Sequence, residues 1–394
     1  MNKKTLLALL YSLVGCSTAS KAPTNIDNIK DKYIASYKKN IDLVINFTSD
    51  EDSDRKDTAK EMLESASYVK HISNYLEYYR SLNGEFDIFK NEISNEDILN
   101  LEKATRGKYS TLLKKLFGLS KIKGENTIHL FLNPTSHMGK SARLKLTPKK
   151  GTTFKDIFKK LKKALPADLP YKVTLILDPD IPGGMYRDTT KSLHMSANIG
   201  VNISSIMGLV HEFGHSVFAT QKNSSFKTEN PKVELIIKGF NEGYAETWSN
   251  NLSNLTFTKN IFPNSNQNLI NDYKEFRSLY GLRFHLLALL MDREILEHPD
   301  KDASWYIETY KEKAREFIFA QNMPPLIPIM PQSQTPGYLP SYLLINIGSS
   351  THLDNSNNLI KSLLDYAKEL HKNDTDSKWS SLLHRATKKF LNEH

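Results

Sequence analysis

The sequence predicts a mainly α-helical (α+β) protein with a small mixed β-sheet. Helical periodicity of apolar residues recurs over most of the chain, and short β-prone stretches bounded by turn residues cluster in one middle region. An apolar run at 206–210 then predicts a helix directly after the last of these stretches. With 394 residues, 39% hydrophobic and 25% charged, the chain is long enough for one large or two ordinary domains.

The first residues have the features of a secretion signal. Two lysines precede an apolar run, Leu6–Val14, that is too short to span a bilayer. The run ends in Leu13-Val14-Gly15-Cys16, which resembles a bacterial lipobox. That resemblance implies cleavage before Cys16 and attachment of a lipid to it. Cys16 is the only cysteine, so an intramolecular disulfide is excluded.

These features divide the chain into four expected regions. We expect a lipoprotein signal peptide at 1–15, a tether at 16–27, a helical N-terminal region at 28–120 and a second region at 121–394. The lipid would anchor the protein to a membrane of the bacterial cell envelope, facing the periplasm or the exterior. We expect a monomer.

The second region holds the predicted strands and one strongly basic helix. Strands are predicted at 127–132, 143–147, 172–177 and 192–198. Between the second and third of these, 154–163 places its apolar residues on one helical face and its lysines on the other. We interpret it as the solvated outer helix of a domain, with a membrane-surface or nucleic-acid helix as the alternative. The net charge of +9 is moderate and no nucleic-acid motif is present, so we expect no nucleic-acid partner.

The predicted helix after 206 carries His211-Glu212-Phe213-Gly214-His215, an H-E-x-x-H pattern. Two histidines four residues apart project from the same helical face, so both imidazoles can reach one zinc ion. Glu212 sits between them, where it can act on a water at the metal as general base and then protonate a leaving amine. We expect the helix to begin near Asn202 or Ser204 as its N-cap.

A catalytic zinc needs a third protein ligand. Glu234 and Glu242 are the two candidates, and spacing from His215 favours Glu234. Local chemistry favours Glu242, because Glu246 lies one helical turn beyond it and can accept the N–H of a ligating imidazole. We therefore predict Glu242 as the ligand and Glu246 as the orienting carboxylate, and we expect Asn241 to cap their helix.

H-E-x-x-H followed by E-x-x-x-[DE] resembles the gluzincin metallopeptidases. The longer gap to Glu242 and the segment Gly337-Tyr338-Leu-Pro-Ser-Tyr342 look like the thimet oligopeptidase and oligoendopeptidase F (M3) family. The resemblance implies a zincin-like fold with one zinc ion and the small sheet beside the H-E-x-x-H helix. It also implies that Tyr338 and Tyr342 assist at the scissile carbonyl, and that strand 193–198 is an edge strand which pairs with substrate.

We therefore expect region 121–394 to be a zincin catalytic region with C-terminal helices. The expected activity is hydrolysis of peptide bonds in a peptide or protein substrate, of the oligopeptidase or endopeptidase type. An M1-like aminopeptidase is one alternative, although its Gly-x-Met-Glu-Asn motif is absent. The other is a surface lipoprotein that keeps the fold and binds without turnover.

Overall fold

A computed structural model describes residues 26, 28–36, 65–82, 93–123, 138, 145–179, 181, 183–221, 241–249, 258–265 and 267–321, and every structural statement below concerns these residues. The predicted strand 127–132 lies outside them. Within the helical region expected at 28–120, the described residues form a helix at 28–36 and two more, α4 (Ala66–Ser81) and α5 (Asn95–Phe117).

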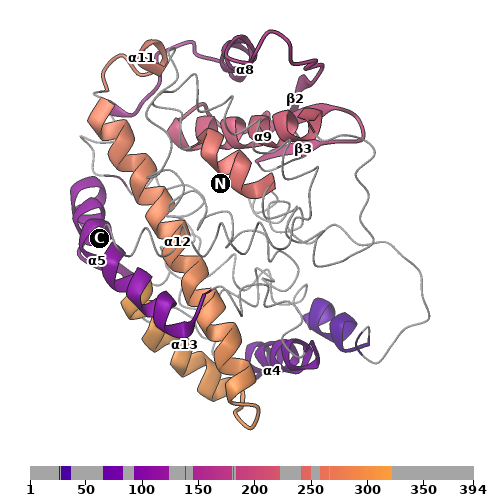
Figure 1. The fold of residues 1–394 in the computed structure, drawn as a ribbon, viewed down its shortest axis with the longest axis vertical. Coiled ribbons are helices and arrows are strands. Elements are labelled where there is room, and N and C mark those ends of the chain that lie inside the picture. The colour runs from indigo at the N-terminus through magenta and orange to yellow at the C-terminus, as the bar shows by residue number, and fades with distance from the viewer. Residues whose placement is uncertain are drawn as a thin grey trace.

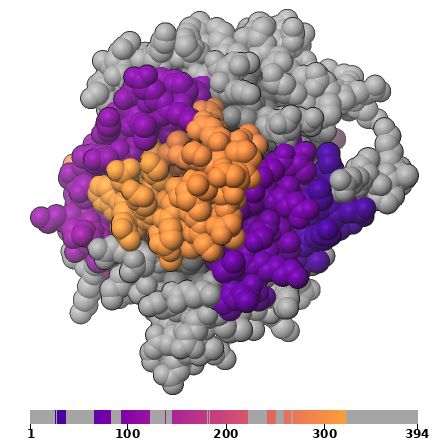
Figure 2. Space-filling view, turned by 90° about the horizontal axis from the view of Figure 1, so that it is seen from below, coloured from indigo at the N-terminus to yellow at the C-terminus, as the bar shows by residue number. Residues whose placement is uncertain are grey.

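The longest helix, α12 (Gln267–Glu297), spans 31 residues and is the central helix of the helical layer. It packs against α5, α4 and α13 (Ala303–Phe317), which lie along its lower half in Figure 1. Figure 2 shows the orange residues of α12 and α13 flanked by the purple residues of the N-terminal helices. Helices distant in sequence therefore share one hydrophobic core, while the boundary predicted near residue 120 stays a prediction.

Local sequence sets the helix ends. Ser94 and Asp97 form a reciprocal capping box at the start of α5, and Gly118 ends that helix in the left-handed conformation at φ 70°. Thr153 and Asp156 form the same box at the start of α8 (Phe154–Lys163). The predicted basic helix is thus confirmed with its predicted bounds.

The small sheet has three strands in the order β2-β4-β3. β2 (Thr174–Asp178) runs parallel to β4 (Ser192–Ser196), and β3 (Gly184–Arg187) runs antiparallel to it. The sheet is mixed and lies beside α9 (Ile203–Gln221), as predicted (Figure 1). The remaining elements are a parallel pair, β1 (Ile122–Lys123) with β5 (Ala320–Gln321), the short helix α11 (Thr258–Ile261) and a helical segment at 241–249.

One predicted strand is wrong, and one observed strand was not predicted. Residues 145–147 of the strand predicted at 143–147 are not in a strand, since Lys145 is helical and Leu146 lies in a turn with its side chain buried. One short alternation followed by Pro148 is a weak strand signal, because proline cannot donate to a sheet ladder. β3 was not predicted, because Gly183-Gly184 reads as a loop in sequence.

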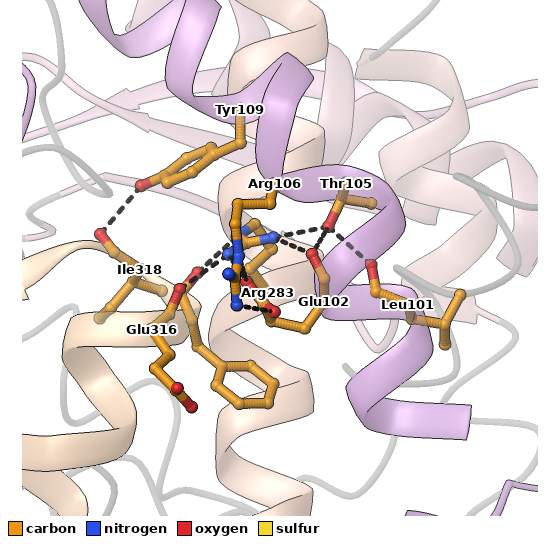
Figure 3. Close-up of polar contacts among 9 residues, drawn as sticks. Leu101, Glu102, Thr105, Arg106, Tyr109, Arg283, Glu316 and Ile318 are labelled. Atoms are coloured by element: carbon orange, nitrogen blue, oxygen red, sulfur yellow. Dashed lines mark hydrogen bonds and ion pairs between the residues drawn. The ribbon is translucent and has the colours of Figure 1, made fainter. Parts of the chain in front are cut away.

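A buried arginine ties three helices together (Figure 3). The Arg283 side chain of α12 is fully buried and forms an ion pair with Glu102 of α5 at 2.5 Å. The same guanidinium donates to the backbone oxygens of Glu316 and Phe317 at the C-terminal end of α13. A buried charge is tolerated only when it is paired and hydrogen-bonded, so this set of contacts specifies how α5, α12 and α13 meet.

We predict that Arg283→Met lowers the free energy of unfolding by about 3–5 kcal/mol, because it leaves the Glu102 carboxylate buried without its buried partner. The matched control is Arg106→Met, which removes the other arginine on Glu102. Its side chain is 48% exposed, so we expect a cost below about 1 kcal/mol. Denaturant unfolding followed by circular dichroism measures both, and equal losses would contradict the assignment.

Candidate metal centre

The H-E-x-x-H motif lies in the middle of α9. The backbone N–H of Ser205 donates to Asn202 Oδ1 at 3.0 Å, and the Asn202 N–H donates to Ser205 Oγ at 2.9 Å, so Asn202 caps the helix as predicted. Apolar side chains of α9, including Phe213, are buried in the core. Phe213 packs edge-on against Phe158 of α8 at 5.9 Å, which fixes the rotation of α9 and leaves its histidines on another face.

Gly214 allows α9 and the helix at 241–249 to cross at very short distance. A Cβ atom at this position would lie 2.6 Å from the backbone Cα of Ala245. Real Cβ atoms essentially never lie this close to another heavy atom. Trp248 lies on the same side at 3.2 Å from that Cβ position. The close crossing brings Glu242 and Glu246, one turn apart, onto the histidine face of α9.

The two imidazoles and one carboxylate converge on a point. His211 Nε2 and His215 Nε2 lie 3.0 Å apart, and Glu242 Oε2 lies 3.5 Å from the first and 3.4 Å from the second. The Glu242 oxygen is buried and has no hydrogen-bond partner among the described residues. Two imidazole nitrogens and a carboxylate oxygen that face one another in this way favour a positive charge between them, supplied by protons or by a cation.

The other ring nitrogens are engaged by groups on the second helix. Asn241 Oδ1 lies 3.1 Å from His215 Nδ1, at hydrogen-bond distance. Glu246 Oε1 lies 3.2 Å from His211 Nδ1, within ion-pair distance although outside hydrogen-bond geometry. Acceptors at both Nδ1 atoms favour the tautomer in which Nε2 carries the lone pair, which is the ligand form of histidine.

The separations fit a small divalent metal. Ligands held tetrahedrally at zinc–ligand distances lie roughly 3.3–3.5 Å from one another, close to the 3.0–3.5 Å edges of this triangle. Two imidazoles and one carboxylate are also a donor set found at catalytic zinc. The described residues therefore fit such an ion on both geometry and chemistry.

Electrostatics favour positive charge at the same point. Burial lowers the pKa of His211, but the carboxylates of Glu246 and Glu242 outweigh burial, and the pKa lies well above its usual 6.5. Burial likewise lowers the pKa of His215, and Glu242 reverses the effect. Burial raises the pKa of Glu242, while His215 and His211 together lower it far below its usual range. Either protons or a cation must supply the charge that these carboxylates face.

Glu212 is held beside this point by the neighbouring strand. One atom each of His211, Glu212 and His215 lies within 4.8 Å of the others. The backbone N–H of Tyr186 in β3 donates to Glu212 Oε2 at 2.8 Å. Gly184 permits the approach, because a Cβ there would lie 2.8 Å from Glu212 Cγ. The contact fixes one carboxylate oxygen of Glu212.

The strand expected to be an edge strand is β4, and this expectation is wrong. β4 is central, with β2 on one side and β3 on the other. His194 of β4 is buried and bonded to Ser192 Oγ at 2.9 Å and Asp178 Oδ2 at 3.0 Å, so it belongs to the sheet. The strand nearest the metal centre is β3, whose pairing within the described residues is to β4 alone.

Four predicted site residues lie outside the part of the chain that the structure describes: Cys16, Glu234, Tyr338 and Tyr342. The structure brings together the other five, His211, Glu212, His215, Glu242 and Glu246. Asn241 is helical and contacts His215 instead of capping its helix. The position of Asn241 directly before Glu242 could have indicated this contact with His215. The contact of Tyr186 with Glu212 is made by the backbone, so no side-chain pattern in the sequence could have indicated it.

Comparison with known proteins finds similarity in fold and none in sequence. Neither a scan of protein-family models nor a search of curated proteins finds a match. Among solved structures, Pz peptidase A with an inhibitor aligns with 95% of this chain and 78% of its own at TM-score 0.60 and 12% identity. A protein assigned as oligoendopeptidase F aligns with 99% of this chain and 78% of its own, at TM-score 0.56 and 10% identity.

A third solved structure, a protein assigned as oligoendopeptidase F from Bacillus anthracis, covers 93% of this chain and 73% of its own, at TM-score 0.56 and 12% identity. Identities this low show the fold alone. The fold is mainly helical and zincin-like, with a small mixed sheet, as the sequence predicts.

We predict that Gly214→Ala lowers the free energy of unfolding by about 1–3 kcal/mol, because the new methyl group must push the two helices apart. The same displacement separates Glu242 and Glu246 from the imidazoles, so zinc affinity should fall by about 10–100-fold. Denaturant unfolding and zinc titration against a competing chelator measure the two effects.

The matched control is Gly208→Ala in the same helix. A Cβ at this position meets nothing within 4 Å, so we expect stabilisation of about 0.5–1 kcal/mol and unchanged zinc affinity. If both alanines weaken zinc binding equally, the close crossing is not what positions the site.

The identity of the third ligand is tested by Glu242→Gln beside Glu234→Gln. A neutral amide is a poor ligand for zinc, so we expect Glu242→Gln to lose the metal and Glu234→Gln to retain it. Elemental analysis of the purified proteins gives the answer directly. Loss of zinc in Glu234→Gln alone would transfer the role to that residue.

Proposed function

We propose that the protein is a zinc-dependent peptidase of the oligopeptidase or endopeptidase type. The observation that carries the proposal is the convergence of His211 Nε2, His215 Nε2 and Glu242 Oε2 on one point beside Glu212. Such a set of groups suits hydrolysis by an activated water. The similarity of the fold to solved metallopeptidases supports the choice of peptide bonds as the target.

In this proposal, His211, His215 and Glu242 hold one zinc ion. When bound, zinc supplies a Lewis acid that lowers the pKa of water and polarises a carbonyl. Asn241 orients His215 by accepting a hydrogen bond from its Nδ1, and Glu246 orients His211 through its negative charge 3.2 Å from Nδ1. Five side chains on two crossing helices, those of α9 and 241–249, thus act on one centre.

Glu212 is the proposed general base. It takes a proton from the attacking water and gives a proton to the amine that leaves when the peptide C–N bond breaks. The Tyr186 N–H holds Oε2, so the other carboxylate oxygen is the one available for proton transfer. Tyr338 and Tyr342 are proposed to donate hydrogen bonds to the oxyanion that forms from the scissile carbonyl.

We propose that an extended peptide binds along the edge of β3 that faces away from β4. Ser196 N donates to Gly183 O, so the alternation of an antiparallel pair directs the backbone groups of Gly184 and Tyr186 away from β4. The Tyr186 N–H on this edge donates to Glu212, so a peptide would pair with the other outward-facing backbone groups of β3. A peptide paired along this edge would run past the metal centre with its backbone held by hydrogen bonds.

We predict that Glu212→Gln retains zinc and its fold while kcat for peptide hydrolysis falls by about 10²–10⁴-fold, because the base is lost. The substrate should be a peptide blocked at its N-terminus, with products identified by mass spectrometry. Internal cleavage of this peptide by the wild type excludes an aminopeptidase. A folded, zinc-loaded wild type that cleaves no peptide would refute the proposed activity and favour a binding protein.

We further propose that the protein resides in the bacterial cell envelope, anchored through a lipid on Cys16. The lipobox at Leu13–Cys16 supports this location. Within the described residues, no helix has the length and apolar character needed to cross a membrane. We expect Cys16→Ser to block incorporation of labelled fatty acid, and unchanged labelling would remove the basis for the anchor.

A further inference from the structure

Most of the net charge of the protein is concentrated in one short segment. Residues 145–172 contain nine lysines, two aspartates and no other charged residue type, a formal charge of +7 in a chain whose total is +9. Eight of the lysines are exposed, and we call them the basic face: Lys145, Lys149, Lys150, Lys155, Lys159, Lys162, Lys163 and Lys172. The remaining sequence is close to neutral.

The fold displays these lysines at one end of the molecule. The apolar residues of α8, including Ile157, Phe158 and Leu161, are buried, so the lysines on the other side of the helix point outward. In Figure 1, α8 lies at the end opposite α4 and α13. Phe158 contacts Phe213, on a face of α9 other than the one that carries His211 and His215, so the basic face is separate from the metal centre.

The basic face has little counter-charge among the described residues, where Asp156 is close enough to Lys159 for the two charges to attract. No described carboxylate forms an ion pair with any of its eight lysines, whereas Lys108, Lys115 and Lys311 elsewhere all have carboxylate partners. Like charges held close together repel and raise the local potential. A surface of this kind attracts polyanions within about a Debye length, roughly 8–10 Å at physiological salt.

Two exposed aliphatic residues follow Lys172 of the basic face closely in sequence, and they point to opposite faces of the sheet because they are consecutive in a strand. The structure describes four exposed large hydrophobic residues, and two of them, Ile176 and Leu177 at 41% each, are on β2. β2 begins two residues after Lys172 and is an edge strand of the sheet. Lysines beside exposed aliphatic residues match the interface of a bilayer, where ammonium groups meet headgroups and apolar side chains enter the acyl boundary.

The composition favours lipid over nucleic acid. Segment 145–172 has no arginine, the residue that reads phosphates and bases with a planar fork. Its aromatic rings are not available for base stacking, because Phe154 and Phe158 are buried and Tyr171 lies under Lys162 Nζ at 5.9 Å. We propose that the basic face and β2 dock on an anionic phospholipid surface. The inference depends neither on the metal centre nor on the lipid at Cys16.

The test is flotation of the full-length Cys16→Ser chain with vesicles of phosphatidylcholine containing phosphatidylglycerol. Vesicles of phosphatidylcholine alone correct for any binding by the apolar N-terminal run. The variant Lys155→Gln/Lys159→Gln/Lys163→Gln removes one row of α8. Each lysine near an anionic surface is worth roughly a five-fold change in partitioning, so we expect at least about a ten-fold loss. Binding of the parent chain should also weaken as salt is raised.

The matched control is Lys70→Gln/Lys103→Gln/Lys114→Gln, which removes three exposed lysines from α4 and α5. This control has the same net charge as the α8 variant but leaves the basic face intact, so we expect binding within about two-fold of the parent. Equal losses in the two triple variants would overturn the proposal in favour of bulk charge. Equal binding of the parent to the two vesicle types would also overturn it. Thermal melts confirm that each variant is folded.

A last variant, Ile176→Thr, separates lipid from nucleic acid. It keeps a β-branched residue in β2 and removes apolar surface, so vesicle binding should fall while any binding to a labelled single-stranded oligonucleotide should not. If the parent binds the oligonucleotide more tightly than the anionic vesicles, and only the α8 variant loses that binding, the face is a nucleic-acid surface and the lipid proposal is wrong.

Discussion

The close crossing of α9 and the helix at 241–249 is the constraint on which the metal centre depends. Gly214 lies against the Cα of Ala245, and no side chain could occupy that space without moving a backbone. At this separation, short side chains such as those of Glu242 and Asn241 reach the imidazoles of the opposite helix. A wider crossing would leave the buried carboxylates of Glu242 and Glu246 without the imidazoles that they face, at a large desolvation cost. Packing of the helices and assembly of the site are therefore one event.

The sheet adds a second constraint from the other side of α9. Glu212 must stay near the two histidines without becoming trapped in a salt bridge, and a backbone N–H from β3 achieves this with a neutral donor. The absence of a side chain at Gly184 lets β3 approach, because a Cβ there would lie 2.8 Å from Glu212 Cγ and 2.9 Å from Met195 Sδ. Strand β3 thus positions Glu212 of the site. Its outer edge is the one that we propose for a peptide ligand.

Distant parts of the chain are held by polar contacts as well as by the core. Arg283 is fully buried and joins α5, α12 and the end of α13, so the loss of one partner would leave a buried charged or polar group unpaired. The opposite end of the molecule has a different character, with a basic face whose lysines form no ion pair with a described carboxylate.

The sequence by itself determined the class of fold, the ends of several helices and the choice of Glu242 and Glu246 over Glu234 as the expected partners. Those conclusions rest on helical periodicity, N-cap residues and four-residue spacing, which are local properties of the chain. Tertiary structure alone decided that Asn241 contacts His215, that β4 is central and that β3 lies against Glu212. These features depend on how closely two backbones approach and on which edge of a strand remains unpaired. Neither property is encoded within one turn of helix or one strand, because both arise only when distant segments pack together.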